Sequence, residues 1–565
     1  MPSGRERTVW RTTAALAASA WLVSNATAGA RDHAEHAARV DKVFAAYDRS
    51  DSPGCTVGVI ADGAFVHVRG YGRANLEHGV PLGPRTVFDI GSTSKQFTAA
   101  AVVLLAQDGR LSLDDDVRKH VSEMPDYGRP VTIRHLLTHT SGLRDYLGLM
   151  GLAGWNFEDV STDDDALRLI VRQRELNFEP GAERLYSNSG YFLLSVIVKR
   201  VTGKTLRAFA AERIFGPLGM ADTHFHDDHA EIVPRRATGY APREGGGFGI
   251  AMSNFEQTGD GSVYTTVEDL RKWDANFYEP KVGGKDLVAQ MTTPGRLRDG
   301  QPLPYALGLA VDRHQGLSRV SHGGSWAGYR AELMRFPEQR LTVACLCNLG
   351  TADPTRLATE VAEIYLGAAL APARAAEAAA AAAGVPWTPA ELAALAGHYR
   401  ERASGQTRRV RFEDGTLRVE TFGGAYELAP VESRRFRMVD GPPTLRVVFE
   451  TDGGSRRMRE EDAARSPTVW EPFAPARPSA AELAAYAGRY LSVEVDTTYA
   501  VEVTDDGLVL KGRRVSGALA PTVRDEFTQG PRVLRFERDA GGRPWAFRLG
   551  QGRIRNLRFT RSDAP

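Results

Sequence analysis

A serine and a lysine stand three residues apart in the segment Gly91-Ser92-Thr93-Ser94-Lys95. At helical spacing both side chains fall on one face, so the lysine amine can approach the serine hydroxyl. The N-terminus of a helix also stabilises the oxyanion that forms when a serine attacks a carbonyl group. A lysine acts as a base only in its neutral form, which burial favours. The pair predicts nucleophilic catalysis by Ser92 with Lys95 as base, although the same spacing also fits a capping serine beside a solvated lysine.

Two later motifs supply further groups that such a reaction needs. Tyr186-Ser187-Asn188 combines a hydroxyl that can relay a proton with an amide that donates and accepts hydrogen bonds. Ser321-His322-Gly323-Gly324-Ser325 precedes a strand-like run, and its glycines would let a substrate approach the backbone closely. Each motif alone also fits an ordinary surface turn, so the prediction depends on their combination.

In this order the three motifs resemble the penicillin-recognising serine hydrolases, a superfamily of class C β-lactamases, DD-peptidases, D-aminopeptidases and related esterases. The resemblance covers about residues 35–366. It implies an α/β (α+β) catalytic domain of the β-lactamase/transpeptidase type that uses neither a cofactor nor a metal. Further stretches that match the family are Phe88-Asp89-Ile90-Gly91, Ile133 to Leu143, and Pro217-Leu218-Gly219-Met220.

The same resemblance implies how the first two motifs act. Ser92 would be the acylated nucleophile and Lys95 would take its proton. Tyr186 would pass a proton to the leaving group, and Asn188 would hold a substrate amide or the lysine.

The resemblance assigns the third motif to substrate binding. The backbone N–H groups of Ser92 and Ser325 would form the oxyanion hole, with Gly324 allowing the approach. His322 would stand where the family has a cationic lysine. Histidine is largely neutral at pH 7, and no Glu-x-x-Leu-Asn pattern follows Tyr186 to supply a deacylating glutamate. We therefore expect no efficient β-lactamase.

Strand and helix patterns show how these motifs are positioned. Cys55 to Ile60 and Phe65 to Val68 are β-rich runs separated by a hairpin signal. Phe97 to Leu105 has helical spacing and ends at Asp108-Gly109. Two more strand-like runs flank Pro337, so strands at both ends of a domain spanning 31–366 enclose helices, as in a layered α/β domain. Cys345 and Cys347 are expected on one face of the last strand as small buried hydrophobes.

The N-terminus has the layout of a secretory signal peptide over residues 1–30. Arg5, Arg7 and Arg11 precede an apolar stretch from Ala14 to Val23, and small residues at 26–30 fit a cleavage site. We expect an exported protein, periplasmic or extracellular; the alternative is a nonspecific Ala-rich helix.

Residues 367–387 are rich in Ala and Pro and are interpreted as a linker or spacer helix. An internal repeat follows at 388–478 and 479–565: Glu391 to Tyr399 recurs as Glu482 to Tyr490, an offset of 91 residues. Short alternating strands with glycine turns predict a small barrel or sandwich for each unit.

A catalytic domain followed by two such units resembles the D-aminopeptidase architecture, in which a loop of the last barrel enters the active site and selects a free amine. That role would need an acidic loop residue, and the candidates are Asp525-Glu526 or Glu494 and Asp496. The alternative is a structural appendage or a wall-binding module.

Composition excludes other classes of protein. The chain has 565 residues, of which 42% are hydrophobic and 25% charged, so it can bury a core and is not disordered. Its net charge of +1 argues against a nucleic-acid partner. The expected partners are a small peptide, amide or ester, with cell-wall fragments, β-lactams and homo-oligomers left open.

Three functional hypotheses follow. The first is hydrolysis of D-residue amides, with ester hydrolysis as its nearest rival. The second is a penicillin-binding wall protein that stays acylated. The third is a metallohydrolase that uses the histidines at 224–229, although this stretch is expected to be a surface loop.

Overall fold

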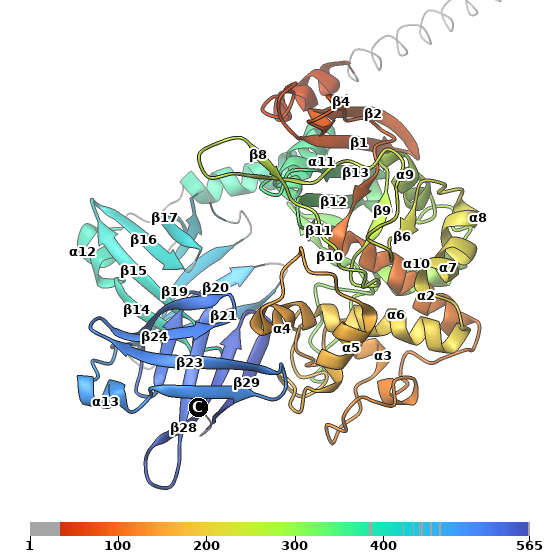
Figure 1. The fold of residues 1–565 in the computed structure, drawn as a ribbon. Coiled ribbons are helices and arrows are strands. Elements are labelled where there is room, and N and C mark those ends of the chain that lie inside the picture. The colour runs from red at the N-terminus through yellow and green to blue at the C-terminus, as the bar shows by residue number, and fades with distance from the viewer. Residues whose placement is uncertain are drawn as a thin grey trace, which may run out of the picture.

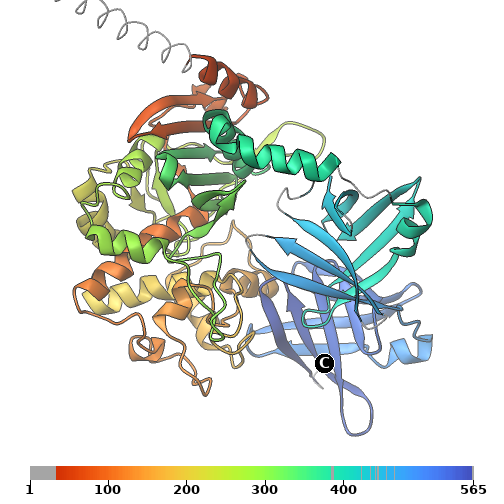
Figure 2. The same cartoon turned by 180° about the vertical axis from the view of Figure 1, so that it is seen from behind.

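The computed structural model describes residues 34–562 except 383–386, 422, 433, 440, 442–444, 453–454 and 463–464. The predicted signal peptide at 1–30 lies outside the described residues. The described chain forms a mixed α/β domain and two closed eight-stranded barrels, which lie side by side along one flank of that domain (Figures 1 and 2). No helix in the described part of the chain has both the length and the apolarity of a membrane span.

A six-stranded antiparallel sheet is the centre of the α/β domain, in the order β10-β11-β12-β13-β1-β2. The predicted hairpin is confirmed as β1 and β2, and the strands on either side of Pro337 are confirmed as β12 and β13. The strands span β1 Cys55–Ala61, β2 Ala64–Tyr71, β10 Ala310–His314, β11 Leu317–Trp326, β12 Tyr329–Phe336 and β13 Leu341–Cys347. Because β1 pairs with β13, the two ends of the domain close onto each other.

One face of the sheet packs against a helix over residues 34–43 and against α11, Pro354–Ala382. The other face carries a helical region built around α2, Lys95–Gln107. Its helices are α3 Ile133–Leu137, α4 Tyr146–Ala153, α5 Asp163–Val171, α6 Asn188–Thr202, α7 Leu206–Ala210, α8 Gly216–Leu218, α9 Val267–Ala275 and α10 Gly284–Thr292, with 3-10 turns η1 Gly91–Ser94, η2 Val117–Lys119 and η4 Pro337–Gln339 and the π-turn η3 Ala211–Phe215. Short strands complete this region: β3 Arg73–Asn75, β4 Val80–Pro81, β5 Phe88–Asp89, β6 His224–Phe225, β7 Tyr240–Pro242, β8 Phe248–Ile250 and β9 Val263–Thr265.

Helix α2 confirms the helix predicted over Phe97 to Leu105. Every residue from Lys95 to Leu105 is buried, which suits a helix that is apolar on nearly all sides. It stops at Asp108 because Gly109 follows in the left-handed conformation, with φ +68°. A lysine at its first position is therefore held inside the domain.

The cysteines correct one expectation. Cys345 and Cys347 are both buried on β13, but Cys347 forms a disulfide with Cys55, 292 residues away, and only Cys345 is free. The bond is possible because Cys55 and Cys347 are directly opposite each other in the β1–β13 pair. No local pattern in the sequence indicates this pairing, because it depends on the first strand lying beside the last.

Each repeat closes into its own barrel, as expected for a small all-β unit. Barrel 1 contains β14 Gly397–Glu401, β15 Thr407–Glu413, β16 Thr416–Thr421, β17 Gly424–Glu432, β18 Arg435–Met438, β19 Arg446–Asp452, β20 Ser455–Asp462 and β21 Arg465–Phe473. Barrel 2 contains β22 Gly488–Ser492, β23 Thr497–Thr504, β24 Gly507–Gly512, β25 Val515–Pro521, β26 Glu526–Gln529, β27 Arg532–Arg538, β28 Pro544–Gln551 and β29 Ile554–Arg561. A short helix precedes each barrel, α12 Pro389–Ala394 and α13 Ala480–Ala484.

The Ala-rich segment continues helix α11 as far as Ala382, with Pro372 inside the helix. Figure 2 shows this helix extending from the sheet toward barrel 1. The α/β domain and barrel 1 are thus joined by helix as well as by the segment 383–388.

Candidate active site

Ser92 and Lys95 meet where η1 runs into α2. Lys95 is completely buried, and its Nζ lies 3.0 Å from Ser92 Oγ and 2.9 Å from Asn188 Oδ1. The same amine donates a hydrogen bond to the backbone carbonyl of Asp260. A protonated Lys95 satisfies all three acceptors, and a neutral Lys95 would present a lone pair to the Ser92 hydroxyl. The structure thus brings together the first predicted pair and Asn188 of the second motif.

The third motif lies against Ser92 because β11 has a free edge there. Strand β10 pairs with β11 only from Leu317 to Ser321, so the edge beyond it faces η1. Thr93 Oγ1 donates to the His322 carbonyl at 3.0 Å. A Cβ on Gly324 would meet the carbonyl oxygen of Ile90 at 1.9 Å, so only glycine allows this approach.

Gly91 is equally constrained, with φ +49° and Ser325 N only 2.8 Å from where its Cβ would be. The backbone N–H groups of Ser92 and Ser325 therefore lie on adjacent segments, which is the placement that a shared oxyanion hole requires.

Tyr186 lies beside the lysine, at the entrance to the site. Lys95 Nζ is 4.9 Å from the centroid of the Tyr186 ring, and the Tyr186 hydroxyl is buried with no hydrogen-bond partner among the described residues. Asn188 is the first residue of α6, where Asp145 Oδ2 accepts its backbone N–H at 2.7 Å. The second motif therefore bridges the lysine and the entrance, with one hydroxyl left for a substrate.

His322 is part of the site but carries no charge. Its Nδ1 donates to the Gly323 carbonyl at 2.7 Å, so its Nε2 accepts from the Tyr305 hydroxyl at 3.0 Å. Burial, followed by the nearby charge of Lys95, lowers the pKa of His322 to about 3. A neutral imidazole orients Tyr305 and offers no cation to a substrate carboxylate.

Two buried acids lie behind the nucleophile. Asp89 accepts the backbone N–H of Gly91 at 2.7 Å, and Asp260 accepts from the Tyr146 hydroxyl at 3.2 Å. Burial raises the pKa of each carboxyl group to about 7, although Lys95 opposes the shift at Asp260. Near neutral pH these acids carry only part of their negative charge.

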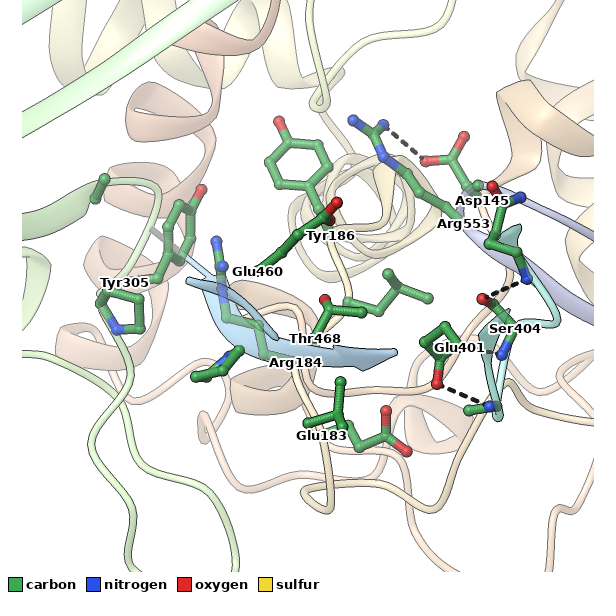
Figure 3. Close-up of a pocket in the computed structure, with 18 of the residues that line it drawn as sticks. Asp145, Glu183, Arg184, Tyr186, Tyr305, Glu401, Ser404, Glu460, Thr468 and Arg553 are labelled. Atoms are coloured by element: carbon green, nitrogen blue, oxygen red, sulfur yellow. Dashed lines mark hydrogen bonds and ion pairs between the residues drawn. The ribbon is translucent and has the colours of Figure 1, made fainter. Parts of the chain in front are cut away.

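A cavity of about 2290 Å³ leads to this site from between the three domains. Its inner wall includes Tyr186, Tyr305 and His322, and residues of both barrels form its outer walls (Figure 3). Access to Ser92 is therefore shaped by the barrels as well as by the catalytic domain.

Barrel 2 contacts the α/β domain through a buried ion pair. The Arg144 guanidinium is fully buried and donates to Glu494 Oε2 at 2.8 Å, as well as to the carbonyls of Arg555 and Asn556. These bonds fix the β28–β29 hairpin, whose tip at 551–553 lines the cavity.

None of the four acids considered for a substrate-selecting loop lines the cavity. Glu494 is used by Arg144, and Asp496 is exposed near Arg172. Asp525 pairs with Arg538 inside barrel 2, and Glu526 pairs with Arg400 of barrel 1. The residue at the tip of the hairpin that does reach the cavity is Arg553, a cation where an acid was expected.

The histidine motif is only partly on a surface loop: the loop follows the short strand β6, and Asp228 is exposed in it. His224 lies in β6, and His226 is 5% exposed and stacks on Tyr264 with ring centroids 4.3 Å apart. Glu231 Oε2 lies 3.4 Å from His226 Nδ1, but both Glu231 oxygens accept from Arg207 at 2.7 Å. The Arg207 guanidinium therefore balances the negative charge of Glu231 beside these histidines.

Several residues that the structure brings to the site from distant segments were not predicted from the sequence. Tyr305 comes from a loop with no recognisable motif, and Arg553 from the second repeat, far along the chain. His139, whose ring centroid is 4.1 Å from that of Tyr186, and Asp145 lie in or next to the family-like stretch 133–143 but had been given no role. The one sequence signal that could have pointed to these two residues is that each is a polar residue in or next to that stretch.

Comparison with known proteins gives consistent results. Residues 40–368 match the profile of the family described as Beta-lactamase. A D-aminopeptidase of Gluconobacter oxydans (strain 621H) is 28% identical over 540 residues, covering 91% of this chain and 96% of that protein. Penicillin-binding protein 4* of Bacillus subtilis (strain 168) is 31% identical over 307 residues, covering 52% of this chain and 67% of that protein. Among solved structures, the octameric penicillin-binding protein homologue from Pyrococcus abyssi is 25% identical with a TM-score of 0.53, covering 78% of this chain and 99% of that one.

Proposed function

Since the chain belongs to the beta-lactamase family of serine hydrolases, we propose that it cleaves amide bonds of small peptide-like substrates through an acyl-Ser92 intermediate. The observation that carries this proposal is the buried Lys95 amine, 3.0 Å from Ser92 Oγ and held there by Asn188. An amide substrate is supported by the D-aminopeptidase relative, because the likeness extends over 91% of this chain and so includes both barrels.

The proposed reaction has two halves. Lys95 takes the Ser92 proton as Ser92 Oγ attacks the substrate carbonyl, and the N–H groups of Ser92 and Ser325 stabilise the resulting oxyanion. Tyr186 gives its hydroxyl proton to the leaving amine and recovers one from Lys95, so the amide bond breaks and the acyl group stays on Ser92. Water then attacks the ester, releases the acid and restores Ser92.

The test compares wild type with Ser92→Ala, using D-alanine p-nitroanilide, p-nitrophenyl acetate and benzylpenicillin. We expect wild type to release p-nitroaniline, and Ser92→Ala to lose at least about a thousandfold in kcat, because removing the nucleophile leaves only binding and the oxyanion hole. Intact-mass analysis should show an acyl adduct in wild type only, with equal melting temperatures showing that both proteins are folded.

The other hypotheses give different results in the same assay. Turnover of the ester alone would indicate an esterase, and a persistent penicilloyl adduct without turnover would indicate a penicillin-binding protein. Activity retained in Ser92→Ala would contradict the proposal.

We also propose that the protein is exported. The sequence pattern at 1–30 supports this proposal, and so does the Cys55–Cys347 disulfide, because such bonds persist in oxidising compartments. N-terminal sequencing of protein recovered outside the cytoplasm should give a start at residue 29 or 31. Recovery of uncleaved protein from the cytoplasm would contradict this.

A further inference from the structure

The turn of the β28–β29 hairpin places Arg553 in the cavity. The Asn177 side chain donates to the Arg553 carbonyl at 2.9 Å and accepts the Arg555 backbone N–H at 2.7 Å. Arg144 binds the carbonyls of Arg555 and Asn556 in β29. The backbone from the Arg553 carbonyl to Asn556 is therefore anchored to the α/β domain, so the position of Arg553 depends on the docking of barrel 2.

The Arg553 guanidinium lies against the catalytic residues. Its Cζ is 4.4 Å from the centroid of the Tyr186 ring, the same ring that lies 4.9 Å from Lys95 Nζ. Figure 3 shows Arg553 next to Tyr186, with its contact to Asp145 drawn as a dashed line. Only the Tyr186 ring would therefore separate an ion bound by Arg553 from the Ser92–Lys95 pair.

Most of the hydrogen-bonding capacity of this guanidinium is unused. Among the described residues its one polar side-chain contact is Nη1 to Asp145 Oδ2 at 3.5 Å, and the side chain is 45% exposed. Asp145 is already occupied, because it caps α4 through the Gly148 N–H and accepts the Asn188 N–H at 2.7 Å. A guanidinium has five donors in a planar fork, so Arg553 can still bind a carboxylate with two parallel hydrogen bonds.

The surrounding charges also favour an anion. The Arg184 guanidinium lies 4.8 Å from the centroid of the Tyr305 ring on the inner wall, and Glu183 is paired with Arg555 at 2.9 Å. Burial, reinforced by the charges of Arg184 and Lys95, keeps the pKa of His139 well below its ordinary value. His322 and His139 are therefore neutral, whereas Arg553 and Lys95 place positive charge next to the Tyr186 ring.

We propose that Arg553 binds a carboxylate group of the substrate beside the acyl-Ser92 position. This specificity rests on the proposed function, and it separates the chain from an aminopeptidase that selects a free amine with an acidic loop. A planar carboxylate is the ligand that matches the arginine fork, whereas a substrate ammonium would be repelled by Arg553 and Arg184.

The test uses p-nitroanilides that differ in charge. Acetyl-D-alanine p-nitroanilide is neutral, and succinyl-D-alanine p-nitroanilide carries a carboxylate on the acyl side. Acetyl-D-alanine 3-carboxy-4-nitroanilide carries one on the leaving group, and D-alanine p-nitroanilide carries a free amine. We expect kcat/KM for at least one anionic substrate to exceed the neutral one by about tenfold to a hundredfold, as for a hydrogen-bonded ion pair. Which anionic substrate is preferred identifies the side of the bond on which the carboxylate binds.

Variants of Arg553 then assign the effect. Arg553→Ala should abolish the preference for the anion, measured as the ratio of kcat/KM for the anionic and the neutral substrate, and Arg553→Glu should shift that preference toward D-alanine p-nitroanilide. Arg558→Ala is the matched control, because Arg558 is in the strand that follows Arg553, is 38% exposed and lies over an aromatic ring, but pairs with Glu537 outside the cavity.

Three results would overturn the inference. The first is a free-amine substrate that is the best in wild type, and the second is an anionic-to-neutral ratio unchanged by Arg553→Ala. Inactivity toward all four substrates would also overturn it; labelling of Ser92 by a fluorophosphonate would then show whether the serine-hydrolase proposal survives on its own.

Discussion

The two barrels come from one repeated sequence and have the same architecture, but they serve different parts of the molecule. Tyr399 and Tyr490, 91 residues apart, donate to the equivalent carbonyls of Leu395 and Tyr486, both at 2.8 Å. The helices before both barrels begin with the same capping box, Thr388 with Glu391 and Ser479 with Glu482. The repeated positions thus maintain the barrel.

The loops between the strands account for the difference. In barrel 2 the loop between β22 and β23 presents Glu494 to the buried Arg144 of the α/β domain. In barrel 1 the equivalent loop, between β14 and β15, presents the carbonyls of Arg402 and Ala403 to Arg535 of barrel 2. The same hairpin thus contacts a different body in each case: that of barrel 2 contacts the catalytic domain, and that of barrel 1 contacts barrel 2. A duplicated fold can acquire a new role by changing a few loop residues while its core stays the same.

The largest effect that we expect in this comparison is at Glu494. Glu494→Ala leaves the Arg144 charge buried without its partner, which costs about 3–5 kcal/mol of stability. It also frees the strand that carries Arg553, so kcat/KM should fall. Thermal unfolding and activity measured on the same samples would check this.

Glu526→Ala is the control for that prediction, because Glu526 pairs with Arg400 across the barrel–barrel interface, as well as with Arg535 of its own barrel. Those arginines are 19% and 31% exposed, so a smaller loss of about 1–3 kcal/mol is expected, with kcat/KM little changed. Equal effects on activity would show that the two interfaces are not specialised.

The next largest expected effect is a difference in how the stability contributions of Asp89, in the α/β domain, and Glu526, between the barrels, respond to pH. Folded Asp89 keeps its proton up to about pH 7, whereas the unfolded chain loses it near pH 4, so its contribution to stability falls as the pH rises from 4 to 7. Burial raises the pKa of Glu526, but its bonds from Arg400, Thr522 and Arg535 outweigh burial and leave that pKa lowered. The barrel–barrel contact should therefore weaken only as the pH falls below the ordinary glutamate range.

Calorimetry between pH 3 and 8 would measure this contrast. Asp89→Asn keeps an acceptor for the Gly91 N–H. It should remove the fall in the free energy of unfolding between pH 4 and 7, which amounts to a few kcal/mol at about 1.4 kcal/mol per pKa unit. Glu526→Gln should flatten the profile of stability against pH only on its acid side. Identical profiles for wild type and Asp89→Asn would contradict the first assignment.

The smallest expected effect tests how alike the barrels are. Tyr399→Phe and Tyr490→Phe each remove one hydroxyl that donates to a backbone carbonyl, and each should cost about 1 kcal/mol. Denaturant unfolding of both variants should give equal losses. A difference of more than about twofold would mean that contact with the α/β domain supports barrel 2 from outside.

Motifs with local spacing could be predicted from the sequence. The hairpin at 55–71, the buried helix α2, the family of the catalytic domain and the duplicated barrels follow from periodicity, turn residues and the 91-residue repeat. Ser92 and Lys95 are one helical turn apart, so the helix brings them together wherever it lies. These predictions succeeded because the information is held within a few residues of each position.

Only the tertiary structure decided what meets across long separations. Cys55 is opposite Cys347 because the first strand pairs with the last, and no pattern within either strand shows that pairing. His322 is neutral because it is buried beside Lys95, and its surroundings come from several segments. The acids expected at the active site are used at interfaces, whereas Arg553 reaches Tyr186 through the docking of barrel 2. Residue types determined which chemistry was available; packing determined which charges stand next to the nucleophile, because the energies of burial and ion pairing depend on neighbours that the chain order does not reveal.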